Sequence, residues 1–210
     1  MYRRCRLWLA IRLIATTLLL VLLVGYLTFL RPWQLRWGAS DVELALDLPG
    51  DDFICDPSFN ATRAITINAP PEMIWPWIVQ IGHKRAGWYS YDWIDNLGRR
   101  SFDYIDPTLQ TLEEGDVISA SPDGRHGFHV HTVRPCEHLL LGNPGELSWV
   151  FFLRPIAENQ TRLITRVRLK YKWLRPEIVF YLLLDVGDIV MMRRCMLGIK
   201  ERAEAFASAG

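Results

Sequence analysis

The stretch Arg162–Trp173, with the sequence RLITRVRLKYKW, alternates polar and apolar side chains along its whole length. Because successive side chains of a β-strand point to opposite faces of a sheet, this pattern predicts a strand with one buried and one solvated face. The apolar face carries Leu163, Thr165, Val167, Leu169, Tyr171 and Trp173. The other face carries Arg162, Arg166, Arg168, Lys170 and Lys172, which we expect to form a basic surface exposed to water.

The same period of two recurs in shorter segments upstream. It predicts further strands over Arg63–Asn68, Asp116–Ala120, Gly127–Val133, His138–Leu141 and Leu147–Leu153. Turn residues at Pro122-Asp123-Gly124 and at Gly142-Asn143-Pro144-Gly145 separate neighbouring strands. Such short connections join antiparallel strands, whereas parallel strands need a long crossover. The sequence therefore predicts an antiparallel sheet.

Helical signals lie before and after these strands. Pro70-Pro71-Glu72 places a proline and an acid where helix N-termini prefer them, which predicts a helix over Pro71–Ile81. A second short helix is expected from Ser90 to Leu97. After Pro176, apolar residues recur every three or four positions and predict a helix of about 30 residues that packs on the sheet. Its apolar stripe comprises Leu182, Val186, Ile189, Met192, Met196, Ile199, Ala203 and Phe206.

The N-terminal region has a different character. Leu13 to Leu30 is a run without a charged side chain, about 27 Å long as a helix and therefore close to the thickness of a hydrocarbon core. We expect one transmembrane helix over residues 7–30 after a basic flank, residues 1–12; a cleaved signal peptide is the alternative. The arginines of the flank favour a cytoplasmic N-terminus and an extracytoplasmic domain. Residues 31–62 are predicted to be an irregular linker, and residues 63–207 a globular domain.

Composition narrows the function further. The 210 residues include 24 basic and 23 acidic ones, so the net charge of +1 gives no reason to expect a nucleic-acid partner. The four cysteines are too widely spaced for a CxxC zinc or redox motif. Cys55 and Cys136 either form a bridge in an oxidising compartment or remain free thiols, and their spacing does not distinguish the two.

Several short motifs carry a resemblance to a known family. They are Ala69-Pro70-Pro71-Glu72, Trp75-Pro76-Trp77, Gly82, the run RAGWYSYDW over Arg85–Trp93, and Asp95-Asn96. Together with the order of elements, they resemble the SRPBCC, or polyketide cyclase/dehydrase-like, branch of the START-like proteins over about residues 60–207. The resemblance implies an α+β helix-grip fold (START/Bet v 1-like), in which a curved antiparallel sheet wraps around a long C-terminal helix, here preceded by one transmembrane helix. It also implies a cavity for lipids, sterols, polyketides or other apolar molecules, but it transfers no catalytic residue.

Aromatic residues gather between Trp75 and Trp93. Tryptophan and tyrosine join a large apolar surface to one polar group, so they suit a cavity wall or a membrane interface, although ordinary core packing is the alternative. With residues of the sheet and the long helix, the predicted ligand-binding set is Trp75, Trp88, Tyr89, Tyr91, Trp93, Trp149, Phe151, Val167, Leu169, Met192 and Met196.

Candidate catalytic groups are few. Asp92, or its neighbours Asp95 and Asp103, has the chemistry of a general base if burial raises its pKa. His129 and His131 are two apart on a predicted strand and can share one side, as metal ligands do, but no third ligand stands at a diagnostic spacing. We therefore expect exposed histidines, no metal and no other cofactor.

These observations lead to one main hypothesis and two alternatives. The main hypothesis is a membrane-anchored protein, held in the bilayer through residues 7–30, that binds an apolar small molecule or lipid between the sheet and the C-terminal helix. One alternative is a cyclase or dehydratase acting on a hydrophobic substrate. The other is a protein-interaction module that uses the aromatic segment, although the sequence identifies no protein partner.

Overall fold

The computed structural model describes residues 2–120, 127–174 and 178–209. They divide into two compact units, Met1–Leu35 and Arg36–Gly210, which are described separately. The predicted turn at Pro122-Asp123-Gly124 and the predicted helix start at Pro176 lie outside the described residues.

The N-terminal unit is helical from end to end. It consists of α1 (Tyr2–Gly25), a π-helical turn η1 (Tyr26–Leu30) and α2 (Arg31–Leu35). The span Trp8–Leu35 has a mean hydropathy of 2.5 in its most apolar window, none of which is buried, so it is long and apolar enough to cross a membrane; a signal sequence shares these properties. The helical structure continues past residue 30, the predicted end of the span, through α2. The wider π turn precedes Pro32, which has no N–H to donate, and Gln34 Nε2 donates to the Tyr26 hydroxyl at 2.9 Å.

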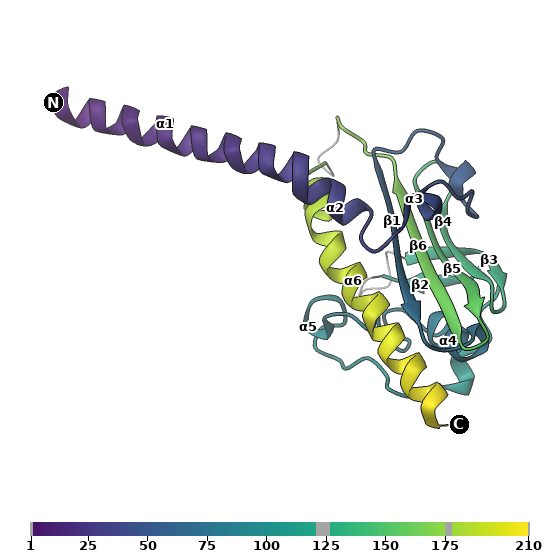
Figure 1. Cartoon of the computed structure of the whole chain (residues 1–210). Coiled ribbons are helices and arrows are strands. Elements are labelled where there is room, and N and C mark those ends of the chain that lie inside the picture. The colour runs from purple at the N-terminus through teal and green to yellow at the C-terminus, as the bar shows by residue number, and fades with distance from the viewer. Residues whose placement is uncertain (1, 121–126, 175–177, 210) are drawn as a thin grey trace. The chain divides into compact units, whose positions relative to one another are not determined.

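The second unit is an α+β domain built on one six-stranded sheet, as the sequence predicts. Its strands are β1 (Phe59–Ile67), β2 (Val117–Ser119), β3 (Gly127–Arg134), β4 (His138–Asn143), β5 (Leu147–Ala157) and β6 (Gln160–Leu169). They run antiparallel in the order β1-β6-β5-β4-β3-β2. The long helix α6 (Ile178–Ala209) lies along one face of the curved sheet, which is the helix-grip arrangement (Figure 1).

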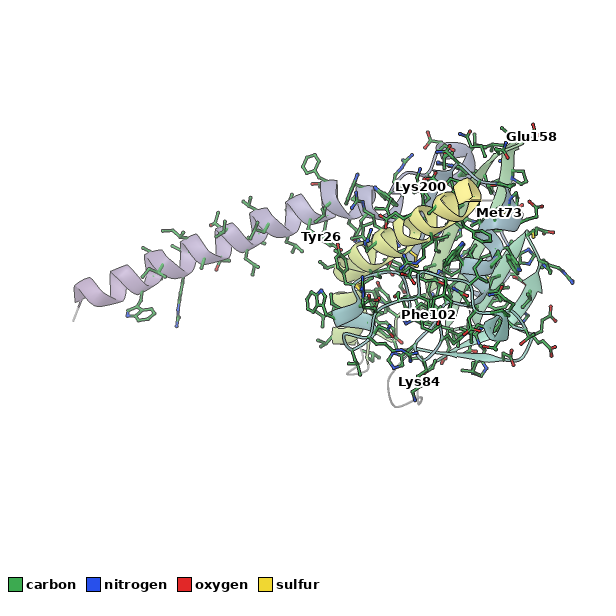
Figure 2. All side chains as sticks on the ribbon, turned by 90° about the horizontal axis from the view of Figure 1, so that it is seen from below. Tyr26, Met73, Lys84, Phe102, Glu158 and Lys200 are labelled. Atoms are coloured by element: carbon green, nitrogen blue, oxygen red, sulfur yellow. The ribbon has the colours of Figure 1, made fainter. Side chains whose placement is uncertain are left out.

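Short helices fill the connections. They are α3 (Asp41–Leu44), η2 (Asp51–Phe53), α4 (Pro71–Val79), α5 (Asp92–Asp95) and η3 (Pro107–Leu109). Helix α4 begins at the predicted proline and packs against α6; in Figure 2, Met73 marks α4 and Lys200 marks α6. The helix predicted from Ser90 to Leu97 is reduced to the single turn α5.

Strand β6 ends earlier than its alternation predicts. Leu169 pairs with Phe59 at the start of β1 and with Leu147 at the start of β5, so no neighbouring strand continues beyond it. Tyr171 is still buried, but Trp173, predicted to lie on the buried face, is 63% exposed. The strand therefore stops where its hydrogen-bonding partners stop, and the alternating side chains extend past that point.

The inner core lies between the sheet and the middle of α6. Met192, Met196, Ile199 and Ala203 are buried as predicted, and Gly198 lets the helix approach Tyr89, whose carbonyl oxygen would be 2.2 Å from a Cβ at this position. The ends of the predicted stripe, Val186 and Phe206, are exposed instead, and the side chain of Leu182 lies outside the described residues. Val186 follows Asp185, which is only 6% exposed, so at this point the helix still lies on the domain and Val186 is on its outward face.

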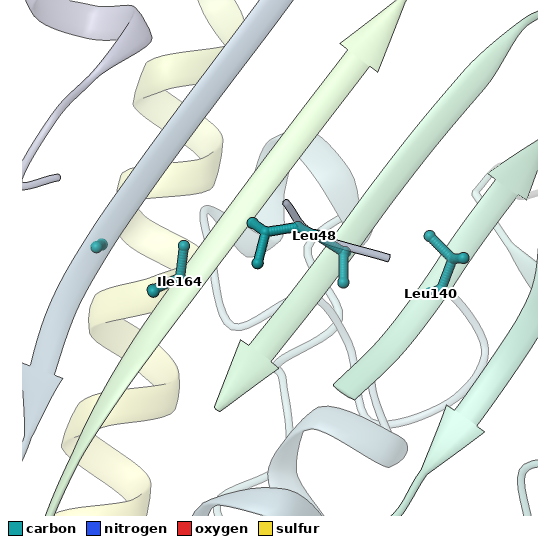
Figure 3. Packing of buried hydrophobic residues seen from close by; sticks show 5 residues of the cluster. Leu48, Leu140 and Ile164 are labelled. Carbon is teal, nitrogen blue, oxygen red and sulfur yellow. The ribbon is translucent and has the colours of Figure 1, made fainter. Parts of the chain in front are cut away.

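The outer face of the sheet is covered, contrary to the prediction of an irregular linker and a water-exposed basic surface. A buried cluster of Leu48, Ala64, Leu140, Val150 and Ile164 joins the segment before β1 to the sheet, with α6 behind it (Figure 3). Ala39, Leu46, Phe53 and Phe152 pack against this cluster. Residues 39–53 are thus part of the domain. Cys55 and Cys136 are both free thiols.

The arginines of β6 hold this segment in place. Arg166, only 4% exposed, donates to Asp51 Oδ2 and to the carbonyl oxygens of Glu43, Leu44 and Leu46. Arg162 donates twice to the Glu43 carboxylate, at 2.6 and 3.0 Å. Burial raises the pKa of Glu43, but hydrogen bonds from Arg162 and Ser40 outweigh it and leave this pKa below its usual value. Arg162 and Arg166 on the outer face are therefore structural anchors.

Candidate functional site

The domain contains a cavity of about 400 Å³ between α6 and the inner face of the sheet. The sheet contributes Phe128, Leu147, Trp149, Val167 and Leu169 to its wall. Helix α6 contributes Tyr181, Leu184, Asp188, Met191, Met192 and Cys195. Trp88, Ser90, Asp95 and Ala120 complete the lining. The size falls within the range of sites for small organic ligands, and the wall is mostly apolar, as in such sites.

Three aromatic rings form one wall of the cavity. Trp88 stacks on Trp149 with ring centroids 5.7 Å apart, and the edge of Phe128 meets Trp88 at 5.8 Å and Trp149 at 5.1 Å. A tight turn positions Trp88: the Gly82 and Gly87 amides each donate to the carbonyl of the other at 3.0 and 3.1 Å. Gly87 has φ = +85°, and a Cβ there would lie 2.3 Å from Ser101 Oγ, so this turn requires glycine.

The predicted ligand-binding residues divide into two groups. Trp88, Trp149, Val167, Leu169 and Met192 line the cavity. Phe151 and Met196 are fully buried in the core, Trp93 is 75% exposed, and Trp75 and Tyr91 are half-buried outside the lining. Tyr89 is buried away from the cavity, where Gln80 Nε2 donates to its hydroxyl at 2.8 Å and Arg202 lies over its ring; burial raises the pKa of its phenol.

Sequence reasoning missed a second stripe on α6. Leu184, Asp188, Met191 and Cys195 recur every three or four residues and line the cavity, one helical face away from the stripe that packs in the core. An acid within an otherwise apolar stripe is the signal that marks this face. Phe128 and Leu147 were likewise not predicted as lining residues, because their role depends on tertiary packing.

Acidic groups lie at the edge of this apolar space. Asp188 accepts a hydrogen bond in an ion pair with Arg63, whose side chain is 0% exposed. Asp95 is half-buried, and burial together with the nearby Asp92 carboxylate raises its pKa to about 6. Burial raises the pKa of the Cys195 thiol to about 12, so this cysteine is neutral at physiological pH.

The other candidate catalytic groups lie elsewhere. Asp92 accepts a hydrogen bond from Ser101 Oγ at 2.6 Å and is not part of the cavity wall, and Asp103 is exposed. His129 and His131 are exposed, a β-bulge interrupts the strand between Val130 and Thr132, and His131 packs against Phe53 with ring centroids 4.6 Å apart. Among the described residues, no group of three His, Cys, Asp or Glu side chains could hold a metal ion.

A second hollow of about 390 Å³ is polar and lies near Phe102 and Tyr104. Its charged side chains are Asp92, Arg100, Asp103, Arg194 and Arg202. Two of the arginines are already engaged: Arg194 pairs with Glu201, and Arg202 donates to the carbonyl oxygens of Phe102 and Gly198. The apolar cavity is therefore the stronger candidate site.

No protein-family model and no curated protein matches the chain. Similar solved structures include protein NE0264 from Nitrosomonas europaea, at 11% identity and a TM-score of 0.43, covering 70% of this chain and 94% of that one. A protein from Arthrobacter aurescens shares 14% identity at a TM-score of 0.39, covering 80% and 93%. The Polyketide_cyc-like protein Cgl2372 from Corynebacterium glutamicum shares 16% at 0.34, covering 71% and 90%. Since all three TM-scores are below 0.5, the helix-grip assignment depends on this chain's own sheet and helix.

Proposed function

We propose that the domain binds an apolar small molecule or lipid in the cavity between α6 and the sheet. The observation that carries this proposal is the cavity itself: about 400 Å³ walled by stacked Trp88 and Trp149, the edge of Phe128 and flexible methionines of α6. Burying an apolar side chain contributes about 1.5–3 kcal/mol, and a ligand enclosed by these rings gains a comparable amount for each group of that size. Methionine side chains adapt to ligands of different shape.

Filling the cavity tests this proposal. Val167→Phe adds volume at a residue that lines the cavity and is the direct partner of Trp149 on the neighbouring strand. We expect this variant to retain about tenfold less of an apolar molecule that co-purifies with the full chain, equivalent to a loss of roughly 1.4 kcal/mol of binding energy. Mass spectrometry of solvent extracts, normalised to protein, gives the measurement.

Val117→Phe is the matched control, since Val117 is an exposed strand residue outside the cavity wall. It should retain the ligand as the wild type does. Equal retention by both variants, or a wild-type chain from which no stoichiometric molecule is extracted, would contradict the proposal.

We further propose that Trp8–Leu35 is an uncleaved, single-pass membrane anchor, with a cytoplasmic N-terminus and an extracytoplasmic domain. Support comes from its mean hydropathy of 2.5 and from Arg12 at the N-terminal end of the apolar run. The chain is expected to stay in the pellet after alkaline carbonate extraction, with its N-terminal residues detected by mass spectrometry. A released chain that starts after residue 35 would identify a signal sequence instead.

The orientation in the membrane is tested separately. External protease should digest the domain in intact spheroplasts but leave it protected in inverted vesicles.

A cyclase or dehydratase activity is the second candidate, because Asp95 lines an apolar cavity and has a pKa near 6, as suits a general base. Recovery of a chemically altered ligand after incubation would support the enzyme, and its recovery unchanged would support binding alone. The aromatic segment fits the protein-interface alternative poorly, since Trp77, Trp88 and Tyr89 are buried.

A further inference from the structure

The charged side chains of the cavity wall are all acidic. The two lining side chains that ordinarily carry a charge at neutral pH are Asp95 and Asp188, and the described residues of the lining include no lysine, arginine or histidine. An otherwise apolar wall with carboxylates at its edge selects among ligands, because a buried charge is tolerated only when it is paired or hydrogen-bonded.

The two carboxylates differ in their partners. Asp188 is matched within the protein, since Arg63 from β1 reaches it across the core. Asp95 forms no ion pair among the described residues: the Ser90 side chain hydrogen-bonds to its carboxylate, but the Oδ1 atom is buried without a hydrogen-bond partner there. A half-buried acceptor of this kind lowers stability unless a donor reaches it. The cavity wall thus has an acceptor without a donor at Asp95, whereas the Asp188 carboxylate is paired.

The aromatic wall favours the same chemistry. Trp88, Phe128 and Trp149 form a cluster of rings in the same cavity as Asp95. Ring faces attract cations, and tryptophan does so most strongly. A carboxylate and several rings in one cavity therefore suit a positively charged group attached to an apolar body.

We propose that the natural ligand is an apolar molecule that carries a single amino group, and that this group binds Asp95. The inference rests on the proposed function and narrows it to one ligand class. Carboxylate ligands are excluded from the same position, because a second negative charge beside Asp95 and Asp92 is repelled.

A matched series of probes tests the ligand class. Naphthylmethylamine, naphthylmethanol and naphthylacetate share a flat apolar body and differ in the charge of the attached group. We expect the full chain in nanodiscs, titrated calorimetrically against empty nanodiscs, to bind the amine about tenfold or more tighter than the alcohol, the effect of one charge-assisted hydrogen bond. The acid should bind more weakly than both.

Two variants and a pH change identify the group responsible. Asp95→Asn should bring amine and alcohol to within about threefold of each other, whereas Asp103→Asn, an exposed acid outside the cavity, should leave the preference intact. Amine binding should weaken as the pH falls below about 6, because protonation of Asp95 removes the charge that the ammonium pairs with. Asp92 on α5 and Cys195 on α6 are the titratable groups that face Asp95. The pKa of Cys195 is in turn raised by Asp188 and lowered by Arg202.

The outcomes separate this inference from the proposed function. Equal binding of all three probes, or an amine preference that survives in Asp95→Asn, would overturn the amine inference and leave apolar binding intact. Failure of all three to bind would contradict the proposed function itself.

Discussion

Asp188→Ala is expected to destabilise the domain by about 3–5 kcal/mol, because it removes the carboxylate that pairs with the fully buried Arg63. The pair joins β1 to α6 across the inner core, so its loss takes one carboxylate away from a guanidinium in a site from which water is excluded. Urea unfolding of the full chain in nanodiscs, followed by tryptophan fluorescence, measures the free energy of unfolding.

Two further variants isolate the cause. The double variant Arg63→Met with Asp188→Leu should recover most of the loss, since replacing both members of a buried ion pair by apolar residues is often neutral. Glu201→Ala removes one member of the exposed pair with Arg194 on the same helix and should change stability by less than about 1 kcal/mol. A loss below 1 kcal/mol in Asp188→Ala would show that the pair does not hold α6 to the sheet.

Arg166→Met is expected to cost a similar amount, about 3–5 kcal/mol, for a different reason. Its guanidinium satisfies Asp51 and three backbone carbonyl oxygens of residues 43–46, and all of these lose a donor together. We expect the segment before β1 to detach from the outer face first. Limited proteolysis should therefore cut within residues 39–53 of the variant before the rest of the domain unfolds.

Lys172→Met serves as the control for Arg166→Met. Lys172 follows the same strand, and its pair with Glu146 is exposed on both sides, so stability should stay within about 1 kcal/mol of the wild type. Wild-type resistance to proteolysis within residues 39–53 of Arg166→Met would mean that the apolar cluster around Leu48 holds the segment without the arginine.

The main elements of the fold follow from local patterns. Alternation along Arg162–Trp173 marks a strand, and the three-to-four spacing after Pro176 marks the long helix, because each periodicity is a direct consequence of backbone geometry. Antiparallel pairing follows from the short turns. The same patterns predict too much burial, since strand β6 stops at Leu169 where its partners end, and Val186 and Phe206 of the predicted α6 stripe are exposed.

The candidate site is less accessible to such reasoning. Trp88 and Trp149 are plausible wall residues from composition, but whether an aromatic side chain faces a cavity or the core depends on packing. Phe151 and Trp149 are two residues apart on β5 and therefore share a face, yet Phe151 is fully buried and Trp149 lines the cavity. The difference is one of tertiary packing, which no local pattern encodes.

The sequence by itself determined an apolar N-terminal helix, an antiparallel sheet and a long C-terminal helix, because these depend on periodicity and hydropathy within continuous segments. Only the tertiary structure decided that the outer face of the sheet is covered and that the arginines of β6 bind the segment before β1. It also decided which side chains enclose the cavity, and that Asp188 forms an ion pair with Arg63 whereas Asp95 forms none within the described part of the chain. These features join residues more than a hundred positions apart, and their energies depend on mutual burial, which exists only once the chain has folded.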